Sequence, residues 1–150
     1  MIIQKADITD DEVLTAITKK SKAHWGYTEE QLLAWSEHLT ITALYIKDNQ
    51  VYKLLTDGGV VGYYSYYTYD EAAVKLDNLF ILPVFIGSGI GRLLMEDFLL
   101  RIKNTGIKKV TLESEPNAKG FYTKFGFVKT GQLETSIKDR YLPIMQLDIM

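Results

Sequence analysis

Apolar and polar positions follow two different periods along the chain, and the changes between them divide it into strands and helices. Runs of β-branched and aromatic residues with alternating polarity predict strands, and apolar residues three and four positions apart predict amphipathic helices. The predicted strands are residues 2–6, 51–56, 60–68, 73–82, 109–114, 127–133 and 141–149. The predicted helices begin near Thr9, at Thr28, after the glycine-rich stretch 86–92 and at Asn117. The segment 40–49 fits either a short helical turn or a loop.

Local signals mark the ends of these helices. Thr9 with Glu12, and Thr28 with Gln31, have the spacing of a capping box, in which each side chain accepts from the other residue's backbone N–H. We expect the helix from Thr28 to end near residue 38. The helix after the glycine-rich stretch should run for about 15 residues and stop at Gly106. Its apolar face consists of Ile90, Leu94, Phe98 and Ile102.

The element order predicts the fold class. The order is β-α-α-β-β-β-α-β-α-β-β, with Asp57-Gly58-Gly59 as the turn of a hairpin. Antiparallel hairpins surround one central β-α-β unit, so we expect an α/β (α+β) fold with a mixed, mostly antiparallel sheet and helices on both faces. A chain of 150 residues has the size of one ordinary domain, and residues 1–150 are therefore predicted to form a single domain.

Composition narrows the function classes. Hydrophobic residues make up 47% and charged residues 24%, as in an ordinary globular protein, and the formal net charge of -2 gives no general attraction for nucleic acid or an anionic membrane. Neither a signal peptide nor a membrane span is evident, so a cytoplasmic protein is expected. The chain has no cysteine, which excludes disulfides, thiolate zinc sites and a cysteine nucleophile. Its two histidines, His24 and His38, are too isolated to predict a metal site.

The stretch Ile-Gly-Ser-Gly-Ile-Gly-Arg at residues 86–92 is the first candidate for chemistry. A strand that runs through a glycine-rich turn into a helix N-terminus is a general device for binding anions. A nucleotide-hydrolase phosphate loop needs Lys-Ser/Thr after its last glycine, but Arg92-Leu93 follows here. A dinucleotide fingerprint would need glycine at position 92. The alternative is purely structural, with Gly87 and Gly89 forming a tight turn and Gly91 allowing close helix packing.

A second segment, Pro-Asn-Ala-Lys-Gly-Phe-Tyr-Thr-Lys-Phe-Gly-Phe at residues 116–127, changes the interpretation of the first. Together the two segments resemble the signatures of the GNAT superfamily of acyl-CoA-dependent N-acetyltransferases, and the element order matches that fold over essentially the whole chain. The segment 22–32 resembles the two-helix region of a bacterial subgroup. Two positions depart from the pattern. Ile86 stands where the family usually has Arg or Gln, and Asn117 lies five residues before Tyr122 instead of seven, so it also fits a helix N-cap after Pro116.

The resemblance implies where acetyl-CoA binds. It would lie between the strands 73–82 and 109–114, with its pantetheine arm paired to backbone groups as an added strand. Its pyrophosphate would rest on the backbone N–H groups of the glycine-rich stretch. The implied cofactor-binding residues are Leu79, Phe80, Ile81, Gly87, Ser88, Gly89, Ile90, Gly91, Arg92, Asn117, Phe121 and Tyr122.

The resemblance also implies direct attack of an amine on the thioester in a ternary complex, because the absence of cysteine excludes an acetyl-cysteine intermediate. Tyr122 matches the position that protonates the thiolate as general acid; its alternative is a packing aromatic. A backbone N–H near Ile81 is the candidate oxyanion donor. Glu113 and Asp77 are the candidate bases, and the alternative for each is an ordinary salt-bridge or sheet-edge residue.

The acceptor side carries the weakest signals. His24, Trp25 and Tyr27 are candidate substrate contacts, with aromatic packing as the alternative. Because side chains alternate along a strand, Tyr63 and Tyr67 should lie on one face and Tyr64 and Tyr66 on the other. These tyrosines fit an aromatic site for a cationic amine, a homodimer surface or core packing. The predicted function is therefore transfer of an acetyl group from acetyl-CoA to an amine-bearing acceptor of unknown identity. The alternative is a catalytically silent acyl-CoA-binding or sensing domain of the same fold.

Overall fold

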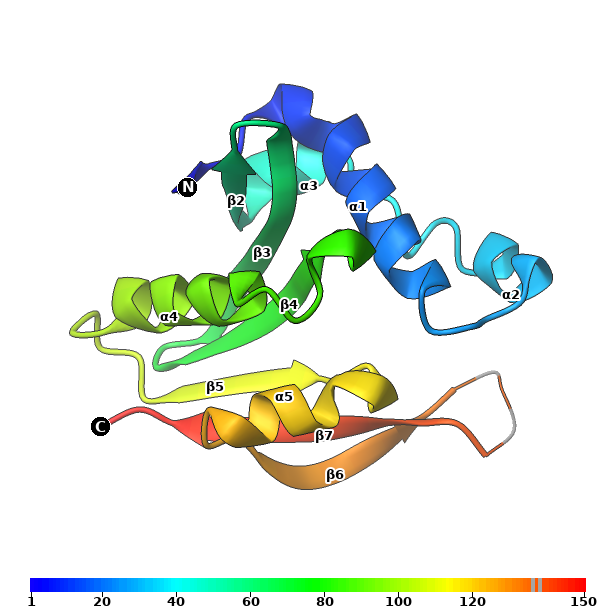
Figure 1. Cartoon of the computed structure of the whole chain (residues 1–150). Coiled ribbons are helices and arrows are strands. Elements are labelled where there is room, and N and C mark those ends of the chain that lie inside the picture. The colour runs from blue at the N-terminus through cyan, green and yellow to red at the C-terminus, as the bar shows by residue number, and fades with distance from the viewer. Residues whose placement is uncertain (136, 138) are drawn as a thin grey trace. The chain divides into compact units, whose positions relative to one another are not determined.

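A computed structural model describes residues 1–135, 137 and 139–150, which form a mixed seven-stranded sheet with helices (Figure 1). The strands are hydrogen-bonded in the order β1-β2-β3-β4-β5-β7-β6. Their bounds are β1 Ile2–Lys5, β2 Gln50–Thr56, β3 Gly59–Asp70, β4 Ala73–Ile81, β5 Lys109–Glu113, β6 Val128–Glu134 and β7 Tyr141–Asp148. The α-helices are α1 Asp11–Ala23, α2 Glu29–Ala34, α3 Ala43–Asp48, α4 Ile90–Ile102 and α5 Lys119–Lys124, and the 3-10 turns are η1 Ile8–Asp10, η2 Pro83–Phe85 and η3 Pro116–Ala118. The predicted fold class is confirmed.

The chain divides into two compact units. Unit 1 consists of residues Met1–Tyr66 and Asn78–Arg101, and unit 2 of residues Tyr67–Asp77 and Ile102–Met150. Strands β3 and β4 therefore each contribute residues to both units. The prediction of a single domain is not decided by this division.

Unit 1 has helices on both faces of its strands. Neighbouring residues of β3 point to opposite faces, because side chains alternate along a strand. The Tyr63 hydroxyl lies 2.5 Å from Thr18 Oγ1 of α1. On the other face the Tyr64 hydroxyl donates to Asp97 of α4 across 2.5 Å. The predicted apolar face of α4 is buried as expected, with exposed fractions of 2% or less at Ile90, Leu94, Phe98 and Ile102.

The strands of unit 2 pair with one another in both parallel and antiparallel orientation. The start of β4 pairs in parallel with β5 from Ala73↔Lys109 to Lys75↔Thr111, and β5 and β6 each pair antiparallel with β7. Helix α5 adds the ring of Tyr122, whose centroid lies 5.8 Å from that of Phe127. The core of this unit includes Val110, Leu112, Tyr122, Phe127 and Met145.

One of the two predicted capping boxes is wrong. The first cap is Asp7, whose side chain accepts from Thr9 N–H, while Asp10 Oδ2 accepts from Asp7 N–H across 2.8 Å. Asp7 is the N-cap of η1 and Asp10 is its last residue. Aspartate is at least as good an N-cap as threonine, and the expected box of Thr9 and Glu12 does not form. The box of Thr28 and Gln31 is confirmed, with bonds of 3.1 and 2.9 Å.

The structure differs from the sequence prediction at the end of α2 and decides the structure of the segment 40–49. Helix α2 ends at Ala34, before residue 38, and hydrogen-bonded turns continue the chain. In the segment left open between a helical turn and a loop, α3 forms, because Thr42 Oγ1 caps it by accepting from Tyr45 N–H across 3.0 Å. Within the described residues, no helix is long and apolar enough to cross a membrane.

Candidate active site

The glycine-rich stretch forms a turn that leads directly into α4. Gly87 and Gly89 have φ angles of +84° and +89°, in the left-handed region that favours glycine. The turn is closed by two backbone bonds of 3.1 Å, from Ile86 N–H to Pro83 O and from Ser88 N–H to Phe85 O. The two glycines are therefore required by the path of the backbone, which agrees with the tight turn of the structural alternative.

The start of α4 has backbone N–H groups without acceptors inside the helix, and there is free space around Gly87 and Gly89. The first helical bond of α4 runs from Leu93 N–H to Gly89 O across 3.1 Å, and the N–H groups that precede it have no acceptor within the helix. A Cβ added at Gly87 or Gly89 would meet nothing within 4 Å, so packing does not explain these glycines. Gly91, in contrast, is buried, which agrees with close packing at that position. The geometry fits an anion approaching exposed N–H groups at the N-terminus of a helix.

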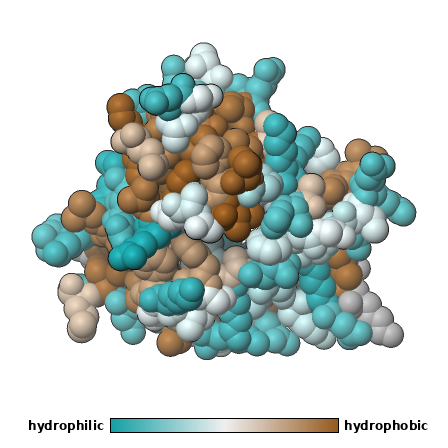
Figure 2. All heavy atoms as spheres, viewed as in Figure 1, coloured by the Kyte–Doolittle hydropathy of each residue, from teal (hydrophilic) through white to brown (hydrophobic). Residues whose placement is uncertain are grey.

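The side chains around the turn are mostly apolar. Val84 and Ile86 are 83% and 40% exposed. Apolar surface also gathers over the part of unit 1 that contains β2 and β3 (Figure 2). Arg92 supplies a positive charge in this segment, and its Nε lies 2.6 Å from Glu96 Oε1 in an exposed ion pair. An anion at the turn would thus meet backbone N–H groups more than charged side chains.

Gly62 of β3 sets the position of the strand that leads to the turn. A Cβ at Gly62 would lie 3.0 Å from Ile81 Cγ2, 3.1 Å from Phe80 O and 3.2 Å from Leu94 Cδ1. Glycine therefore lets β4 and α4 approach β3 closely. Gly62 was not predicted as a site residue, although a glycine inside a run of β-branched and aromatic residues is a known sign of such an approach. Of the predicted pantetheine contacts, Phe80 packs on Tyr63 with ring centroids 6.1 Å apart.

Tyr122 lies in α5 among aromatic side chains of unit 2. Its ring makes edge contacts with Phe121 and Phe127 at centroid distances of 5.2 and 5.8 Å, and it is only 8% exposed. Burial raises the pKa of the Tyr122 phenol above its ordinary value. The phenol consequently keeps its proton throughout the neutral range, as a general acid must before it reacts.

Glu113 takes part in an ion pair. Lys75 Nζ lies 3.2 Å from Glu113 Oε1, and the two side chains are 25% and 37% exposed. Partial burial disfavours the charge on Lys75, but the carboxylates of Glu113 and Asp77 outweigh it and the pKa of the Lys75 ammonium is raised. The salt-bridge alternative for Glu113 is therefore observed, and any role as a base has to compete with Lys75.

Asn117 is not a helix N-cap. It lies inside η3, which begins after Glu115, and its Nδ2 donates to Glu115 Oε1 across 2.7 Å. Glu115 Oε2 also accepts from Arg140 Nη2 at 3.0 Å, in an ion pair whose side chains are 10% and 12% exposed. The N-cap alternative is wrong, because Glu115 is the N-cap of η3, two residues before Asn117, and Ala118 is the N-cap of α5. The pair of Glu115 and Arg140 was missed, since 25 residues separate its members.

The candidate acceptor residues make two aromatic pairs after α1. His24 and Trp25 meet edge to face at 4.9 Å, and Tyr27 meets Trp35 at 5.0 Å with an interplanar angle of 78°. The packing alternative is thus present for all three predicted residues. Trp35 was not predicted, although it is one of the chain's two tryptophans.

The tyrosine-rich strand is used for packing in unit 1. The rings of Tyr64 and Tyr66 stack at 6.2 Å, and both make edge contacts with Phe98. Tyr52 stacks on both Tyr64 and Tyr66, and the Arg101 guanidinium lies 3.8 Å from the ring centroid of Tyr52. The cation that contacts these tyrosines is therefore a side chain of the protein. Burial, followed by the hydrogen bond to Asp97, raises the pKa of Tyr64.

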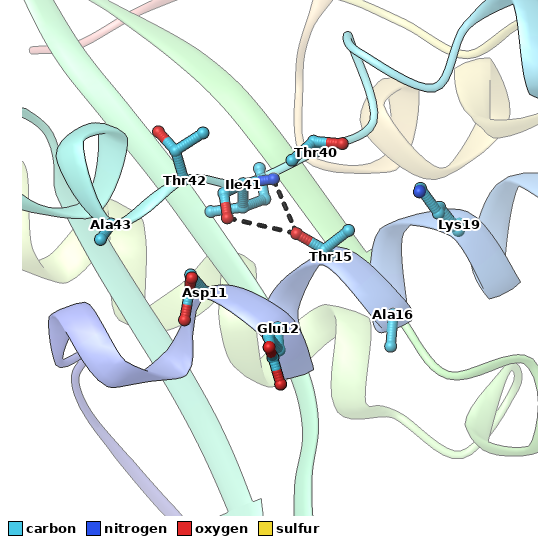
Figure 3. Close-up of a pocket in the computed structure, with 9 residues that line it drawn as sticks. All are labelled: Asp11, Glu12, Thr15, Ala16, Lys19, Thr40, Ile41, Thr42 and Ala43. Carbon is cyan, nitrogen blue, oxygen red and sulfur yellow. Dashed lines mark hydrogen bonds between the residues drawn. The ribbon is translucent and has the colours of Figure 1, made fainter.

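Unit 1 also contains an open groove of about 490 Å³ along α1 (Figure 3). Thr15 Oγ1 ties its two sides together, donating to Ile41 O at 3.2 Å and accepting from Ile41 N–H at 2.8 Å. The lining residues are Asp11, Glu12, Thr15, Ala16, Lys19, Thr40, Ile41, Thr42 and Ala43. It includes none of the predicted site residues. Within the described part of the chain, no three His, Asp or Glu side chains form a group that could hold a metal ion.

Comparison with known proteins supports one family. The model of the acetyltransferase (GNAT) domain matches residues 7–142. A segment of 94 residues is 34% identical to the [ribosomal protein bS18]-alanine N-acetyltransferase of Haemophilus influenzae, covering 61% of this chain and 60% of that protein. The chain spans less than two thirds of the length of the curated relatives it matches.

Solved structures share the fold. A GCN5-related N-acetyltransferase from Rhodopseudomonas palustris superposes with a TM-score of 0.82 at 21% identity, covering 99% of this chain and 95% of that one. The PaiA N-acetyltransferase of Thermoplasma acidophilum, solved in complex with coenzyme A, gives 0.81 at 20% identity and covers 99% and 98% of the two chains.

Proposed function

Since the chain belongs to the GNAT acetyltransferase family, we propose that residues 1–150 form one acetyl-CoA-dependent N-acetyltransferase domain acting on a primary amine. The observation that carries the proposal is the turn between β4 and α4. It follows a strand, it needs glycine at Gly87 and Gly89, and it leaves the first N–H groups of α4 without an acceptor inside the helix. This is the chemistry that a coenzyme A pyrophosphate requires.

We propose that N–H groups of residues 87–92, except that of Ser88, which donates to Phe85 O, bind this pyrophosphate. We also propose that the backbone of Leu79, Phe80 and Ile81 pairs with the pantetheine arm. The apolar, exposed side chains of Val84 and Ile86 support binding through main chain. A bound coenzyme A in the Thermoplasma acidophilum relative, which has the same fold, supports the choice of ligand. Asn117 and Phe121 are proposed as further contacts, with Asn117 limited by its bond to Glu115.

The proposed reaction forms an amide bond and breaks a thioester. The neutral nitrogen of the acceptor attacks the acetyl carbonyl carbon, whose oxygen accepts from a backbone N–H near Ile81. The carbon–sulfur bond breaks, and the Tyr122 hydroxyl gives its proton to the departing sulfur. The proton that the nitrogen loses goes to Glu113, to Asp77 or through water to solvent, and the Tyr122 phenolate regains a proton from solvent. The Tyr122 phenol is protonated at neutral pH, so it has a proton to give when the thiolate forms.

A thiol-release assay tests the proposal. Wild-type protein is incubated with acetyl-CoA and a panel of primary amines, including a peptide with an N-terminal alanine because of the similarity to the Haemophilus influenzae enzyme. We expect amine-dependent thiol release and a product whose mass is increased by one acetyl group. Saturable acetyl-CoA binding without turnover of any amine would support the silent acyl-CoA-binding domain instead.

A further inference from the structure

The side chain of Asn78 in β4 is held by two hydroxyl groups of unit 1. Its Nδ2 donates to Ser65 Oγ of β3 across 2.9 Å and to the Tyr45 hydroxyl of α3 across 3.2 Å. These two hydroxyl oxygens lie 2.8 Å from each other. Ser65 is fully buried, with an exposed fraction of 0%, and Tyr45 is half-buried. The three polar atoms therefore form a closed triangle whose inner corner is shielded from solvent.

The hydrogens available in this triangle decide which end of the Asn78 amide faces inward. With the nitrogen inward, its two N–H groups and the hydroxyl hydrogen of Ser65 supply one hydrogen for each of the three contacts. With the oxygen inward, the two hydroxyl hydrogens would have to serve all three contacts. The nitrogen therefore faces the triangle, and Oδ1 is the outer atom of the amide.

Oδ1 of Asn78 is an accessible acceptor with a fixed direction. Within the part of the chain that the structure describes, it accepts no hydrogen bond. Every buried side-chain oxygen and nitrogen among the same residues has a partner, so Oδ1 is open to solvent although Asn78 is half-buried. The amide cannot rotate without breaking both bonds of its nitrogen. A ligand group that meets Oδ1 has to be a hydrogen-bond donor.

The position of Asn78 along β4 indicates which ligand this is. The parallel pairing of β4 with β5 extends to Lys75↔Thr111, and the proposed pantetheine edge begins at Leu79. A pantetheine arm that pairs as an added strand lies in the plane of the sheet and uses main-chain groups, whereas side chains stand out of this plane. The proposed cofactor site thus leaves Oδ1 to the second reactant, the amine.

The proposed reaction gives this amine a hydrogen to donate. When the nitrogen of a primary amine has bonded to the acetyl carbon, it carries two hydrogens. One leaves as the proton that the base or solvent takes, and the other remains as the N–H of the amide product. A carboxamide oxygen accepts hydrogen bonds without taking the proton. Oδ1 can therefore orient the nitrogen through the hydrogen that stays.

We propose that Asn78 Oδ1 binds the attacking nitrogen of the acceptor and makes the enzyme selective for primary over secondary amines. This inference rests on the proposed acetyltransferase function. A secondary amine has a single hydrogen, which it loses, so Oδ1 is left without a donor. Ser65 and Tyr45 are positioning residues that act through Asn78. The sequence did not indicate this site, because the partners of Asn78 are 13 and 33 residues away.

The test compares a primary amine with its N-methyl derivative. The probes are butylamine with N-methylbutylamine, and a peptide beginning with alanine with the same peptide beginning with N-methylalanine. The measured quantity is the primary-to-secondary ratio of kcat/KM within each pair. In Asn78→Leu, which keeps the size of the side chain without an acceptor, this ratio should be about 3- to 30-fold lower than in wild type. Asn78→Asp, which keeps an outer oxygen, should retain most of the wild-type ratio.

Two further variants separate this role from general damage to the fold, which lowers the rates of both amines and leaves their ratio unchanged. Ser65→Ala removes one bond that fixes the amide and should lower the ratio less than Asn78→Leu does. Leu44→Ala changes a 65% exposed residue on the same helix as Tyr45 and should leave the ratio as in wild type. If Asn78→Leu does not fold, Asn78→Val, which suits a strand, takes its place.

Calorimetric titration with acetyl-CoA distinguishes the inference from the proposed function. The dissociation constant for acetyl-CoA should change by no more than about 3-fold in Asn78→Leu, because Oδ1 does not contact the cofactor. If amines are acetylated with the same primary-to-secondary ratio in wild type and Asn78→Leu, the inference is overturned and the acetyltransferase proposal stands. An unchanged ratio together with weaker acetyl-CoA binding also overturns it, because Asn78 then serves the cofactor. If acetyl-CoA binds and no amine is acetylated, the proposed function and the inference both fail.

Discussion

The turn at residues 86–92 and the helix α5 offer the proposed reaction two different kinds of groups. The turn offers backbone N–H groups in an exposed position, surrounded by apolar side chains, and depends on the left-handed φ of Gly87 and Gly89. Helix α5 offers one side chain, the buried phenol of Tyr122, held by two aromatic neighbours. A main-chain site should be sensitive to backbone conformation and tolerant of side-chain identity, whereas a phenolic acid should show the reverse.

Removal of the Tyr122 hydroxyl should have the largest effect. Tyr122→Phe keeps the ring contacts with Phe121 and Phe127 but removes the proton donor. We expect kcat to fall about 10²- to 10⁴-fold, the usual contribution of a general acid, with the KM for acetyl-CoA changed by no more than about 3-fold. Steady-state kinetics measure both values. A kcat equal to that of wild type would remove Tyr122 from this role and leave the pyrophosphate site untouched.

A change of backbone conformation in the turn should have the next largest effect, on binding. Gly89→Ala puts a Cβ on a residue with φ +89°, which costs about 1–2 kcal/mol and favours a different path for the turn. The KM for acetyl-CoA should rise about 5- to 30-fold, while kcat at saturation stays close to wild type.

Gly58→Ala is the matched control for this substitution. Gly58 lies in the hairpin turn of the same unit, has open space around its Cα and has no left-handed φ. The control should leave KM unchanged. Equal KM values for Gly89→Ala and wild type would contradict the assignment of the turn to the pyrophosphate.

A side-chain change in the turn should have a small effect. Ile86→Arg adds a positive charge beside the proposed pyrophosphate site, and we expect acetyl-CoA affinity to be unchanged or tighter by up to about 5-fold, the range of exposed ionic contacts. Val84→Arg adds the same charge two residues earlier at an 83% exposed position and should change the affinity less. A clearly weaker affinity in Ile86→Arg would mean that the turn has been misaligned with the family signature.

The smallest expected effect is that of pH on kcat through the titration of Tyr122. Because burial raises the pKa of Tyr122 above the ordinary tyrosine value near 10, its protonated form persists to higher pH than in a solvated phenol. The falling limb that it contributes to kcat should therefore lie above about pH 10, and kcat should be level or rising from neutral pH to that point. A decline of kcat with an apparent pKa below this value, absent in Tyr122→Phe, would contradict the assignment.

The elements that were predicted from sequence are those whose signals are local. Alternating polarity and the glycines between segments predicted the strands. Thr28 and Gln31 predicted the start of α2, because a capping box depends on two residues only three apart. The failure at Thr9 and Glu12 has the same origin. Asp7 and Asp10 offer an equivalent box two residues earlier, and periodicity does not distinguish the two.

The parts that were missed depend on contacts between distant residues. Lys22 and Trp35 come into contact only when α1 and α2 are folded. Glu115 and Arg140 are separated in the sequence by α5 and β6. Nothing in the spacing of these residues indicates that they pair. The family signatures, in contrast, could be identified because the turn before α4 and the segment around Tyr122 are each continuous in sequence.

The most direct test of the account is a calorimetric titration of the wild-type protein with acetyl-CoA. We expect saturable binding of one molecule per chain, with a dissociation constant of about 1 μM to 1 mM, the usual range of KM values for enzyme substrates, and weaker binding by Gly89→Ala. No saturable heat at millimolar acetyl-CoA would contradict it.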